Sequence, residues 1–340
     1  MDNKRIILVL LIVLIVVSAA SLKLKGGLNL FSKKDDEIEI IRSDDDYDFE
    51  ITEEDGMRKT VLYFKDKQGL LVPVMRKIPW EEGIAKSALR NMVDSPELRE
   101  SISSTGLSPI IPAGTKIRGM AIDQETGLCK VDFSEEILNY DSQKDEESLI
   151  KGIVYTLTEF PTINEVQILV EGEVMPSLKF GADVSSPLKR ENINLVGNLD
   201  GERSKVVVYY KGHNFEEDFE YFVPVTIPTL APVPNIYTAL EALFDGPPLE
   251  FSLTSDIPEG TSFHGVDIKD GIAYVDISFD YGDPPEDTEV FNDMIKNIGL
   301  TLSEFDQVER VELLIDGKSL DEAGLDFYIN ATIPAFANEY

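Results

Sequence analysis

Two pairs of acidic residues stand at matched places in the chain, and carboxylates are the residue type here most able to do chemistry. Asp132 lies in VDFS and Asp276 in VDIS, while Glu159 lies in TEF and Glu304 in SEF. A carboxylate pair about 5–10 Å apart across a cleft can hydrolyse a glycosidic bond. Aspartate at a strand end also holds turns and caps helices. Since residues that recur in duplicated segments usually serve the fold, we expect turn and helix-end roles and predict no catalytic residue.

Histidine and cysteine are too scarce to build an obvious reactive centre. His213 and His264 are the two histidines. The chain contains two similar halves, and the histidines are not at equivalent positions in them, because Arg118 aligns with His264. We expect both to be surface residues. Cys129 is the single cysteine, so it cannot form an intrachain disulfide or a thiolate-rich metal site. Its aligned residue is Ala273, which predicts a small buried strand residue rather than a catalytic thiol.

Two short patterns resemble ligand loops but each lacks an essential glycine. LLIDGKSL (313–320) ends like a phosphate-binding loop, yet Glu312 stands where that loop needs glycine. The alternating aspartates of residues 44–48 have the spacing of a calcium loop, yet Phe49 occupies its sharp-turn position. We therefore predict no cofactor-binding and no metal-binding residues, and we interpret 313–320 as a hairpin turn.

A duplication explains why the acidic pairs are matched. TLTEFPTINEVQILVEGE (156–173) and TLSEFDQVERVELLIDGK (301–318) are identical at seven of 18 aligned positions. Three further blocks match at similar offsets: ALRNMVDSPE with ALEALFDGPP, IPAGTKIRGM with IPEGTSFHGV, and GLCKVDFSEE with GIAYVDISFD. An offset of about 145 residues is the size of a domain and much longer than a solenoid repeat.

The hydrophobic pattern predicts the same order of elements, β-β-α-β-β-α-β, in each copy. In the first copy we expect strands at 61–64 and 70–78 around a turn, then a helix in WEEGIAKSALRNMVDSP, two strands, a helix at 144–160 and a strand in EVQILVEG. In the second copy we expect helices at 236–244 and 288–305. The predicted class is α+β: two tandem duplicated domains, with helices packed on one face of a mainly antiparallel sheet, after an N-terminal membrane segment.

The charge of the chain restricts its partners. There are 63 acidic and 31 basic residues, which gives a formal net charge of −32. Such a surface repels phosphate backbones, so we predict no nucleic-acid binding. It also disfavours anionic lipid and anionic wall polymers, whereas it suits solubility and cationic partners.

The N-terminal region predicts export. Residues 6–22 are an apolar run preceded by Lys4 and Arg5, so residues 1–27 are interpreted as a signal anchor or, alternatively, a cleavable signal peptide. Residues 28–56 are rich in acidic side chains that repel one another, which predicts a flexible acidic tether. The two domains are then expected at 57–190 and 202–335.

The repeated motifs together resemble a known family. LVPVMRKIP, ALRNMVDSP, IPAGTKI, CKVDFSEEILNY and IVYTLTEFPTINEVQILVEGE are similar to the GerMN domain, and a tandem pair of such domains after an export signal is typical of the GerM family of sporulation and spore-germination proteins. The resemblance implies a non-enzymatic envelope module placed between the two membranes around the forespore. It also implies a fold similar to ring-building α/β modules. Family members are commonly lipoproteins with a cysteine directly after the export signal, but here no cysteine stands directly after the apolar run.

The leading functional prediction is an exported scaffold or adaptor, tethered to the cell membrane through residues 6–22 and facing away from the cytoplasm. Its expected partners are envelope or sporulation-complex proteins, whose assembly or localisation it would support. The alternative is a peptidoglycan-binding module that uses the aromatic residues Trp80, Tyr209 and Tyr210, although Trp80 is expected to pack beneath the first helix. The third possibility, a glycan-cleaving enzyme, is disfavoured by the residue inventory.

Overall fold

The structure is a computed structural model that describes residues 56–340 except positions 82, 198–200, 202–203, 281–284, 286 and 326–330. The predicted membrane segment at 6–22 and all of the predicted tether except residue 56 lie outside the described residues. Within the described part, no helix is long and apolar enough to cross a bilayer. The described residues all belong to one compact unit, which contains every described core residue.

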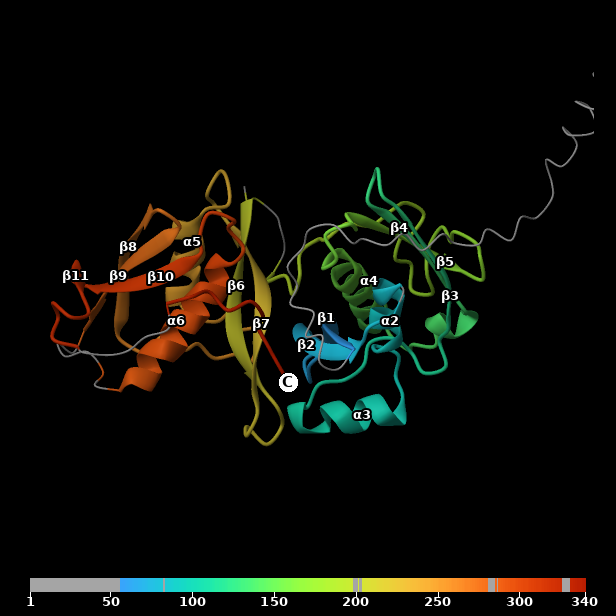
Figure 1. Cartoon of the computed structure of the whole chain (residues 1–340), viewed down its shortest axis with the longest axis horizontal. Helices are drawn as coiled ribbons and strands as arrows, with labels where there is room; N and C mark the ends of the chain where they lie inside the picture. Colours follow the sequence, from blue (N-terminus) through green and yellow to red (C-terminus); the bar gives the residue numbers. More distant parts are fainter. Residues whose placement is uncertain are drawn as a thin grey trace, which may run out of the picture. The chain divides into compact units, whose positions relative to one another are not determined.

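The first domain follows the predicted order, with one extra helix (Figure 1). Strands β1 (Met57–Lys65) and β2 (Leu71–Pro79) form an antiparallel hairpin. The chain continues through α2 (Ile84–Arg90), α3 (Pro96–Ile102), the 3₁₀ turn η1 (Ser103–Thr105), β3 (Ile117–Asp123), β4 (Leu128–Phe133), the 3₁₀ turn η2 (Glu135–Leu138), α4 (Gln143–Thr158) and β5 (Glu165–Val170). Strand β4 pairs antiparallel with β3 and parallel with β5.

The second domain repeats this plan. Its elements are β6 (Ser204–His213), β7 (Glu220–Thr229), α5 (Ile236–Phe244), β8 (Thr261–Lys269), β9 (Ile272–Phe279), α6 (Thr288–Leu302), β10 (Arg310–Ile315) and the short β11 (Lys318–Ser319). Strands β6 and β7 form a hairpin, and the second sheet has the order β11-β10-β9-β8 with β9 and β10 parallel. Both the VDFS and VDIS segments therefore lie at the ends of equivalent central strands, β4 and β9, as the duplication predicts.

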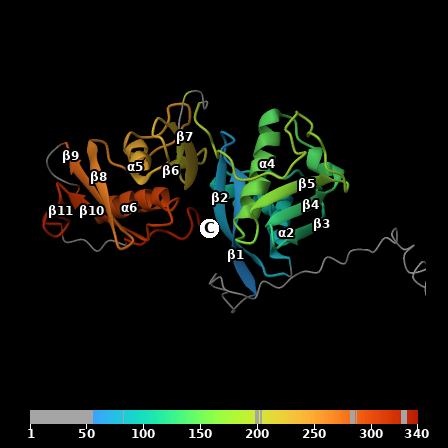
Figure 2. The same cartoon turned by 90° about the horizontal axis from the view of Figure 1, so that it is seen from above.

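The single, mainly antiparallel sheet expected in each domain is wrong in detail, although the α+β class is correct. Each domain has two separate sheets, a hairpin and a mixed sheet, and α4 and α6 lie between the two sheets of their domains (Figure 2). Helix α4 contacts β1 on one side and β5 on the other, and α6 contacts β6 and β10 in the same way. The parallel pair arises because a helix connects β4 to β5, and such a crossover returns the chain in the same direction.

Helix α4 forms for the reasons that the sequence predicts. The Ser142 side chain accepts a hydrogen bond from the backbone N–H of Asp145 and so caps the first turn. The apolar residues at helical spacing are buried, with relative exposures of 0–2%: Leu149, Ile153, Val154 and Leu157. These side chains fill the space between the hairpin and the mixed sheet.

Helix α3 is an addition to the predicted elements, because a proline such as Pro96 is common just beyond the end of a helix and so suggests a loop. Proline is also favoured in the first turn of a helix. Here the Ser95 hydroxyl accepts from the backbone N–H of Leu98, while Glu97 lies in the first turn, where the helix dipole favours an acidic residue. The sequence Ser-Pro-Glu was thus a helix start inside what was taken as a loop.

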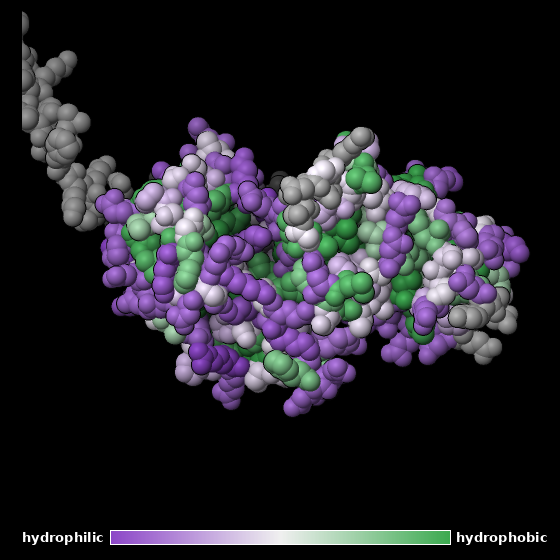
Figure 3. All heavy atoms as spheres, turned by 180° about the vertical axis from the view of Figure 1, so that it is seen from behind, coloured by the Kyte–Doolittle hydropathy of each residue, from purple (hydrophilic) through white to green (hydrophobic). Residues whose placement is uncertain are grey.

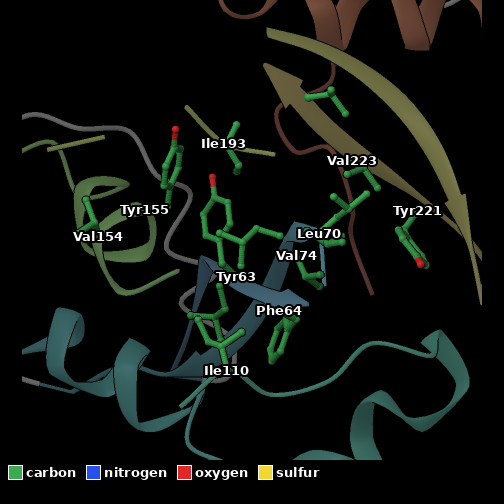
Figure 4. Close-up of a cluster of buried hydrophobic side chains, with 14 of the residues drawn as sticks. Tyr63, Phe64, Leu70, Val74, Ile110, Val154, Tyr155, Ile193, Tyr221 and Val223 are labelled. Atoms are coloured by element: carbon green, nitrogen blue, oxygen red, sulfur yellow. The ribbon is translucent and has the colours of Figure 1, made fainter. Parts of the chain in front are cut away.

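The two hairpins meet through β2 and β7, so one contiguous hydrophobic core runs through both domains. Val74 and Val223 are 1% and 0% exposed at this contact, and Figure 4 shows their side chains beside each other with Tyr63 and Tyr155 close by. Pro73 in β2 and Pro224 in β7 lack a backbone N–H, which is why such strands occur at sheet edges. Pro73 within the run 70–78 indicates an edge strand or a bulge, and β2 is an edge strand, since it belongs to a two-stranded sheet.

Candidate functional site

The matched aspartates hold turns. The Asp132 carboxylate accepts from the backbone N–H of Gly172 at 2.8 Å, and Asp276 accepts from Gly317 at the same distance. Both glycines have positive φ, 84° and 74°, a conformation that glycine adopts most readily. Each aspartate therefore locks the turn that follows the parallel partner strand. The prediction that these residues stabilise turns is confirmed.

The matched glutamates bind tyrosines from the hairpins. The Tyr63 hydroxyl donates to Glu159 at 3.0 Å, and the Tyr209 hydroxyl donates to Glu304 at 3.3 Å. Burial, followed by the charge of the partner glutamate, raises the pKa of both tyrosines well above the usual range. The hydroxyls therefore remain protonated and act as hydrogen-bond donors. The sequence predicted helix-end positions for the glutamates but gave no sign of these partners.

Arg190 links the two tyrosine–glutamate pairs electrostatically. Its guanidinium lies 2.5 Å from the Glu159 carboxylate and 4.9 Å from the centre of the Tyr155 ring. Burial lowers the pKa of Arg190, but the nearby Glu159 more than compensates, so the net shift is upward. The pKa of Glu304 is raised by desolvation and by the Glu159 charge, while Arg190 opposes this shift. The contacts of Arg190 are thus with Glu159 and Tyr155, and its positive charge also favours the ionised form of Glu304 in the second domain.

Two asparagines clasp the domains at the hairpin contact. The Asn194 amide group donates to the carbonyls of Leu71 and Pro224, both at 2.8 Å, and its oxygen accepts from the Leu71 N–H. Asn338, near the C-terminus, donates to the carbonyls of Pro73 (2.7 Å) and Phe222 (2.8 Å) and accepts from the Phe222 N–H. Each asparagine therefore ties a backbone segment of β2 to one of β7.

The clasp residues were missed in the sequence, although a signal was available. Asn338 follows Asn194 by 144 residues, nearly the offset of the later repeat blocks. Asn338 also lies outside the predicted domain boundary of 202–335. It is only 4% exposed, so the last residues of the chain belong to the folded body.

The histidines and the cysteine have structural surroundings. His264 is exposed and lies 2.7 Å from the Ser278 hydroxyl, while His213 lies 2.9 Å from the Thr254 hydroxyl. Cys129 is fully buried on β4, as predicted, and burial raises its pKa to about 12, so its thiol is unreactive at neutral pH. Among the described residues, no group of three or more His, Cys, Asp or Glu side chains is placed to hold a metal ion.

A hollow of about 590 Å³ lies beside the C-terminal residues, and its walls carry both charges. Lys211 contacts Glu220 at 2.9 Å and Asp256 at 2.6 Å, and Lys59 lies 3.3 Å from Glu339. Because these two ammonium groups already have acidic partners, the hollow does not offer an anion a cluster of free cations.

The aromatic residues considered for glycan binding do not form one platform. Trp80 is 55% exposed, so the expectation that it packs beneath the first helix is wrong. It lies directly after the end of β2, where the chain leaves the sheet. Tyr210 is fully buried and its hydroxyl donates to the backbone carbonyls of Ala242 and Gly246. Tyr209 is committed to Glu304 in the cluster described above.

Comparison with known proteins agrees with the duplication. The family described as "Germane: Sporulation and spore germination" matches residues 61–175 and 207–321. The chain is 31% identical over 269 residues to the "Spore germination protein GerM" of Bacillus subtilis, across 76% of this chain and 71% of that protein.

A solved structure shows the same fold. The tandem GerMN domains of the sporulation protein GerM from Bacillus subtilis superpose with a TM-score of 0.67 at 27% identity, and the match covers 83% of this chain and 99% of that one. The family match covers both copies of the repeat, which are the two folded domains. The chain therefore belongs to the sporulation and spore germination family and carries tandem GerMN domains.

Proposed function

We propose that this member of a sporulation and germination family is a non-enzymatic scaffold or adaptor of the cell envelope. In this proposal the protein is exported, and residues 6–22 tether it to the membrane with its domains on the extracytoplasmic face. In a sporulating cell this face would be the space between the two membranes. The proposed role is to support the assembly or localisation of an envelope protein complex.

The observation that carries the proposal is the clasp between two copies of one fold. Asn194 and Asn338 join β2 to β7 by hydrogen bonds, and the core is continuous across the contact. Two domains held in this way present two partner surfaces at a fixed separation. Simultaneous engagement of both surfaces raises overall affinity without any new contact. This arrangement of the two domains favours a role in holding other proteins in place.

The use of the matched carboxylates supports the non-enzymatic part of the proposal. Asp132 and Asp276 are hydrogen-bonded to turn glycines, and Glu159 and Glu304 to tyrosine hydroxyls. A general acid or nucleophile must face the substrate with its reactive oxygen. Residues that have equivalent structural partners in both domains are better explained as requirements of the fold.

A capture experiment tests the scaffold proposal. Residues 44–340, which contain the whole described core, would be immobilised and exposed to detergent-solubilised envelope from sporulating cells. The matched control is the double variant Asn194→Ala, Asn338→Ala, which keeps both domains but loosens their contact. We expect specific envelope proteins to bind the intact protein and to be lost faster from the double variant. If no envelope protein is enriched over an unrelated acidic protein, the scaffold proposal is wrong.

Membrane tethering requires a separate test with the full chain. We expect fractionation to place the chain in the membrane pellet and added protease to digest residues 44–340 from outside the cytoplasm. Recovery of the intact chain from the cytosol would contradict the export proposal.

Peptidoglycan binding remains the second candidate because one observation favours it. The Trp80 ring is 55% exposed and could stack on a sugar. Co-sedimentation of residues 44–340 with purified peptidoglycan, compared with Trp80→Ala, tests this candidate. Peptidoglycan binding requires that the unchanged protein sediments with peptidoglycan and that the Trp80→Ala variant sediments clearly less.

A further inference from the structure

The second domain has an open strand edge beside an exposed aromatic group. In the part of the sheet that the structure describes, β8 is the outer strand of the order β11-β10-β9-β8. Its inner edge pairs with β9, with a register shift between Phe263 and Gly265. An edge strand offers backbone N–H and C=O groups on its outer side to any extended segment that approaches.

Three aromatic side chains, called here the aromatic shelf, lie where β8 meets α5. Phe263 on β8 lies 5.2 Å from the Tyr237 ring and 5.2 Å from the Phe244 ring, measured between ring centroids. Tyr237 and Phe244 are seven residues apart on α5 and so share one face of the helix. The Tyr237 side chain is 46% exposed, so the shelf can be reached from solvent.

The aromatic shelf is particular to the second domain. The aligned positions of the first copy hold no aromatic residue, but Lys86, Val93 and Ile117. The fold alone therefore does not require aromatic side chains here. Apolar side chains also lie in the segment just before α5, where Leu230 is 77% and Val233 is 62% exposed. Figure 3 shows that apolar residues interrupt the hydrophilic surface of the described domains in several places.

The chain segment that forms the shelf is rich in acidic residues. Residues 212–268 include ten acidic residues and no lysine or arginine, and two of the ten, Glu220 and Asp256, are paired with Lys211. This run contains β7, α5 and nearly all of β8; Asp245 directly follows Phe244, and Glu241 lies four residues after Tyr237 on α5. The cation at the end of β8, Lys269, is paired with Asp267 at 2.6 Å. An acidic surround with an aromatic centre is complementary to a basic segment that also has apolar side chains.

We propose that the outer edge of β8 and the aromatic shelf bind an extended segment of a partner protein in which lysine or arginine alternates with aliphatic residues. The segment adds to the sheet as a further strand, through backbone hydrogen bonds to β8. Since side chains of a strand point alternately to its two faces, the residues on one face contact Tyr237 and Phe263. Cationic side chains gain from the acidic surround and from aromatic ring faces. This inference rests on the proposed scaffold function and names the chemistry of one partner.

The binding test uses residues 44–340 and a synthetic nonapeptide of alternating lysine and valine. One control peptide has the same composition with its lysines and valines in two blocks. A second has alternate backbone nitrogens methylated, which removes the donors needed for strand addition but keeps the charge. We expect the alternating peptide to bind at least about tenfold more tightly than either control, because the methylated peptide loses the hydrogen-bonded edge and the block peptide cannot place valines on one face and lysines on the other. Equal affinity for all three peptides would mean non-specific attraction to an acidic protein and would overturn the proposal.

Location is tested by hydrogen exchange and by one substitution. On peptide binding we expect slower amide exchange in residues 261–269 and no change in 117–123, the equivalent edge strand of the first domain. Tyr237→Ser should weaken binding about tenfold, whereas Phe180→Ser, at an exposed aromatic residue of the first domain, should leave it unchanged. Equal protection of both edges, or no effect of Tyr237→Ser, contradicts the assignment. A Tyr237→Ser protein that binds peptide normally but no longer sediments with peptidoglycan would make the shelf a glycan site and also overturn it.

The same variant separates this inference from the scaffold proposal. If Tyr237→Ser captures envelope proteins as well as the unchanged protein does, the scaffold proposal stands and the assignment of partner binding to the β8 edge is wrong. If the unchanged protein captures none but binds the alternating peptide at 261–269, the surface is correct and the scaffold proposal is wrong.

Discussion

Replacing Asn338 with alanine should uncouple the two domains. The Asn338 side chain is 4% exposed and makes three hydrogen bonds to backbone groups of β2 and β7, at 2.7, 2.8 and 2.7 Å. Alanine leaves the Pro73 carbonyl and the Phe222 N–H and carbonyl without these partners. A typical hydrogen bond contributes about 1 kcal/mol net, and an unpaired buried group costs about 1–3 kcal/mol. Partial access of water to the loosened contact reduces the sum, so we expect a loss of about 2–4 kcal/mol.

The shape of the unfolding transition is as informative as its midpoint. Urea unfolding of residues 44–340 would be followed by circular dichroism and by tyrosine and tryptophan fluorescence, since Trp80 reports on the first domain alone. We expect the Asn338→Ala transition to move to lower urea and to differ between the two probes, because the domains unfold separately once the contact is weak. The control is Asn139→Ala at an exposed position, which should change the free energy of unfolding by less than about 0.5 kcal/mol.

The result that refutes this reasoning is specific. If Asn338→Ala changes the free energy of unfolding no more than Asn139→Ala does, and the probes still coincide, the C-terminal residues do not clasp the domains. The scaffold proposal would then lose its main support, and the backbone pairing of Asn338 and Glu339 with Met75 on β2 would be the remaining contact between the end of the chain and that strand. Asn194→Ala provides an independent check, because its side chain makes three equivalent hydrogen bonds from the other side of the repeat.

Three further predictions follow from other contacts. Burial raises the pKa of Glu146, but its hydrogen bonds from a tyrosine hydroxyl and two backbone N–H groups lower it by more, so the net shift is downward. The stabilisation from Glu146 is therefore present above the unfolded pKa and is lost as pH falls through the folded pKa. Glu146→Gln should cost about 1–3 kcal/mol at pH 7, and its urea midpoint should converge with that of the wild type below about pH 4.5. Thr156→Val and Thr301→Val each remove the acceptor for a hairpin N–H (3.3 and 3.2 Å), and matched losses of about 1–2 kcal/mol by urea titration are expected; strongly unequal losses would contradict the equivalence of the domains. Incubation with purified peptidoglycan should release no muropeptides; release that Asp132→Asn with Asp276→Asn abolishes in a folded protein would establish an enzyme.

The sequence was sufficient for features that depend on local periodicity and on the duplication. The α5 bounds agree with the prediction, and α4 and α6 agree within about two residues except at the C-terminal end of α6, which is three residues shorter than expected. Apolar residues at helical spacing predict a helix whatever it packs against. A turn role for Asp132 and Asp276 was also predicted, because an aspartate that recurs at a strand end in both copies usually serves the fold, but their glycine partners, 40 and 41 residues away, were not.

Features that depend on contacts distant in sequence were not predictable in this way. The division of each domain into two sheets depends on which strands pair. No local sequence pattern indicates that β2 and β3 do not pair with each other. The clasp depends on Asn338 meeting Pro73 and Phe222, which are 265 and 116 residues away. Trp80 was misplaced because an aromatic residue before a helix was assumed to be buried, whereas the chain turns outward there.

The comparison of the two copies separates what the fold needs from what distinguishes the domains. Tyr63 and Tyr209 have the same contacts in both copies, so selection for the fold alone accounts for them. Tyr237 stands where the first copy has Lys86, on a helix surface where either residue is compatible with the fold. An exposed position at which duplicated domains differ is free to serve a partner of one domain only. A scaffold with two interchangeable faces would need no such difference, so we expect the two domains to bind chemically different partners, with the basic one at the second domain.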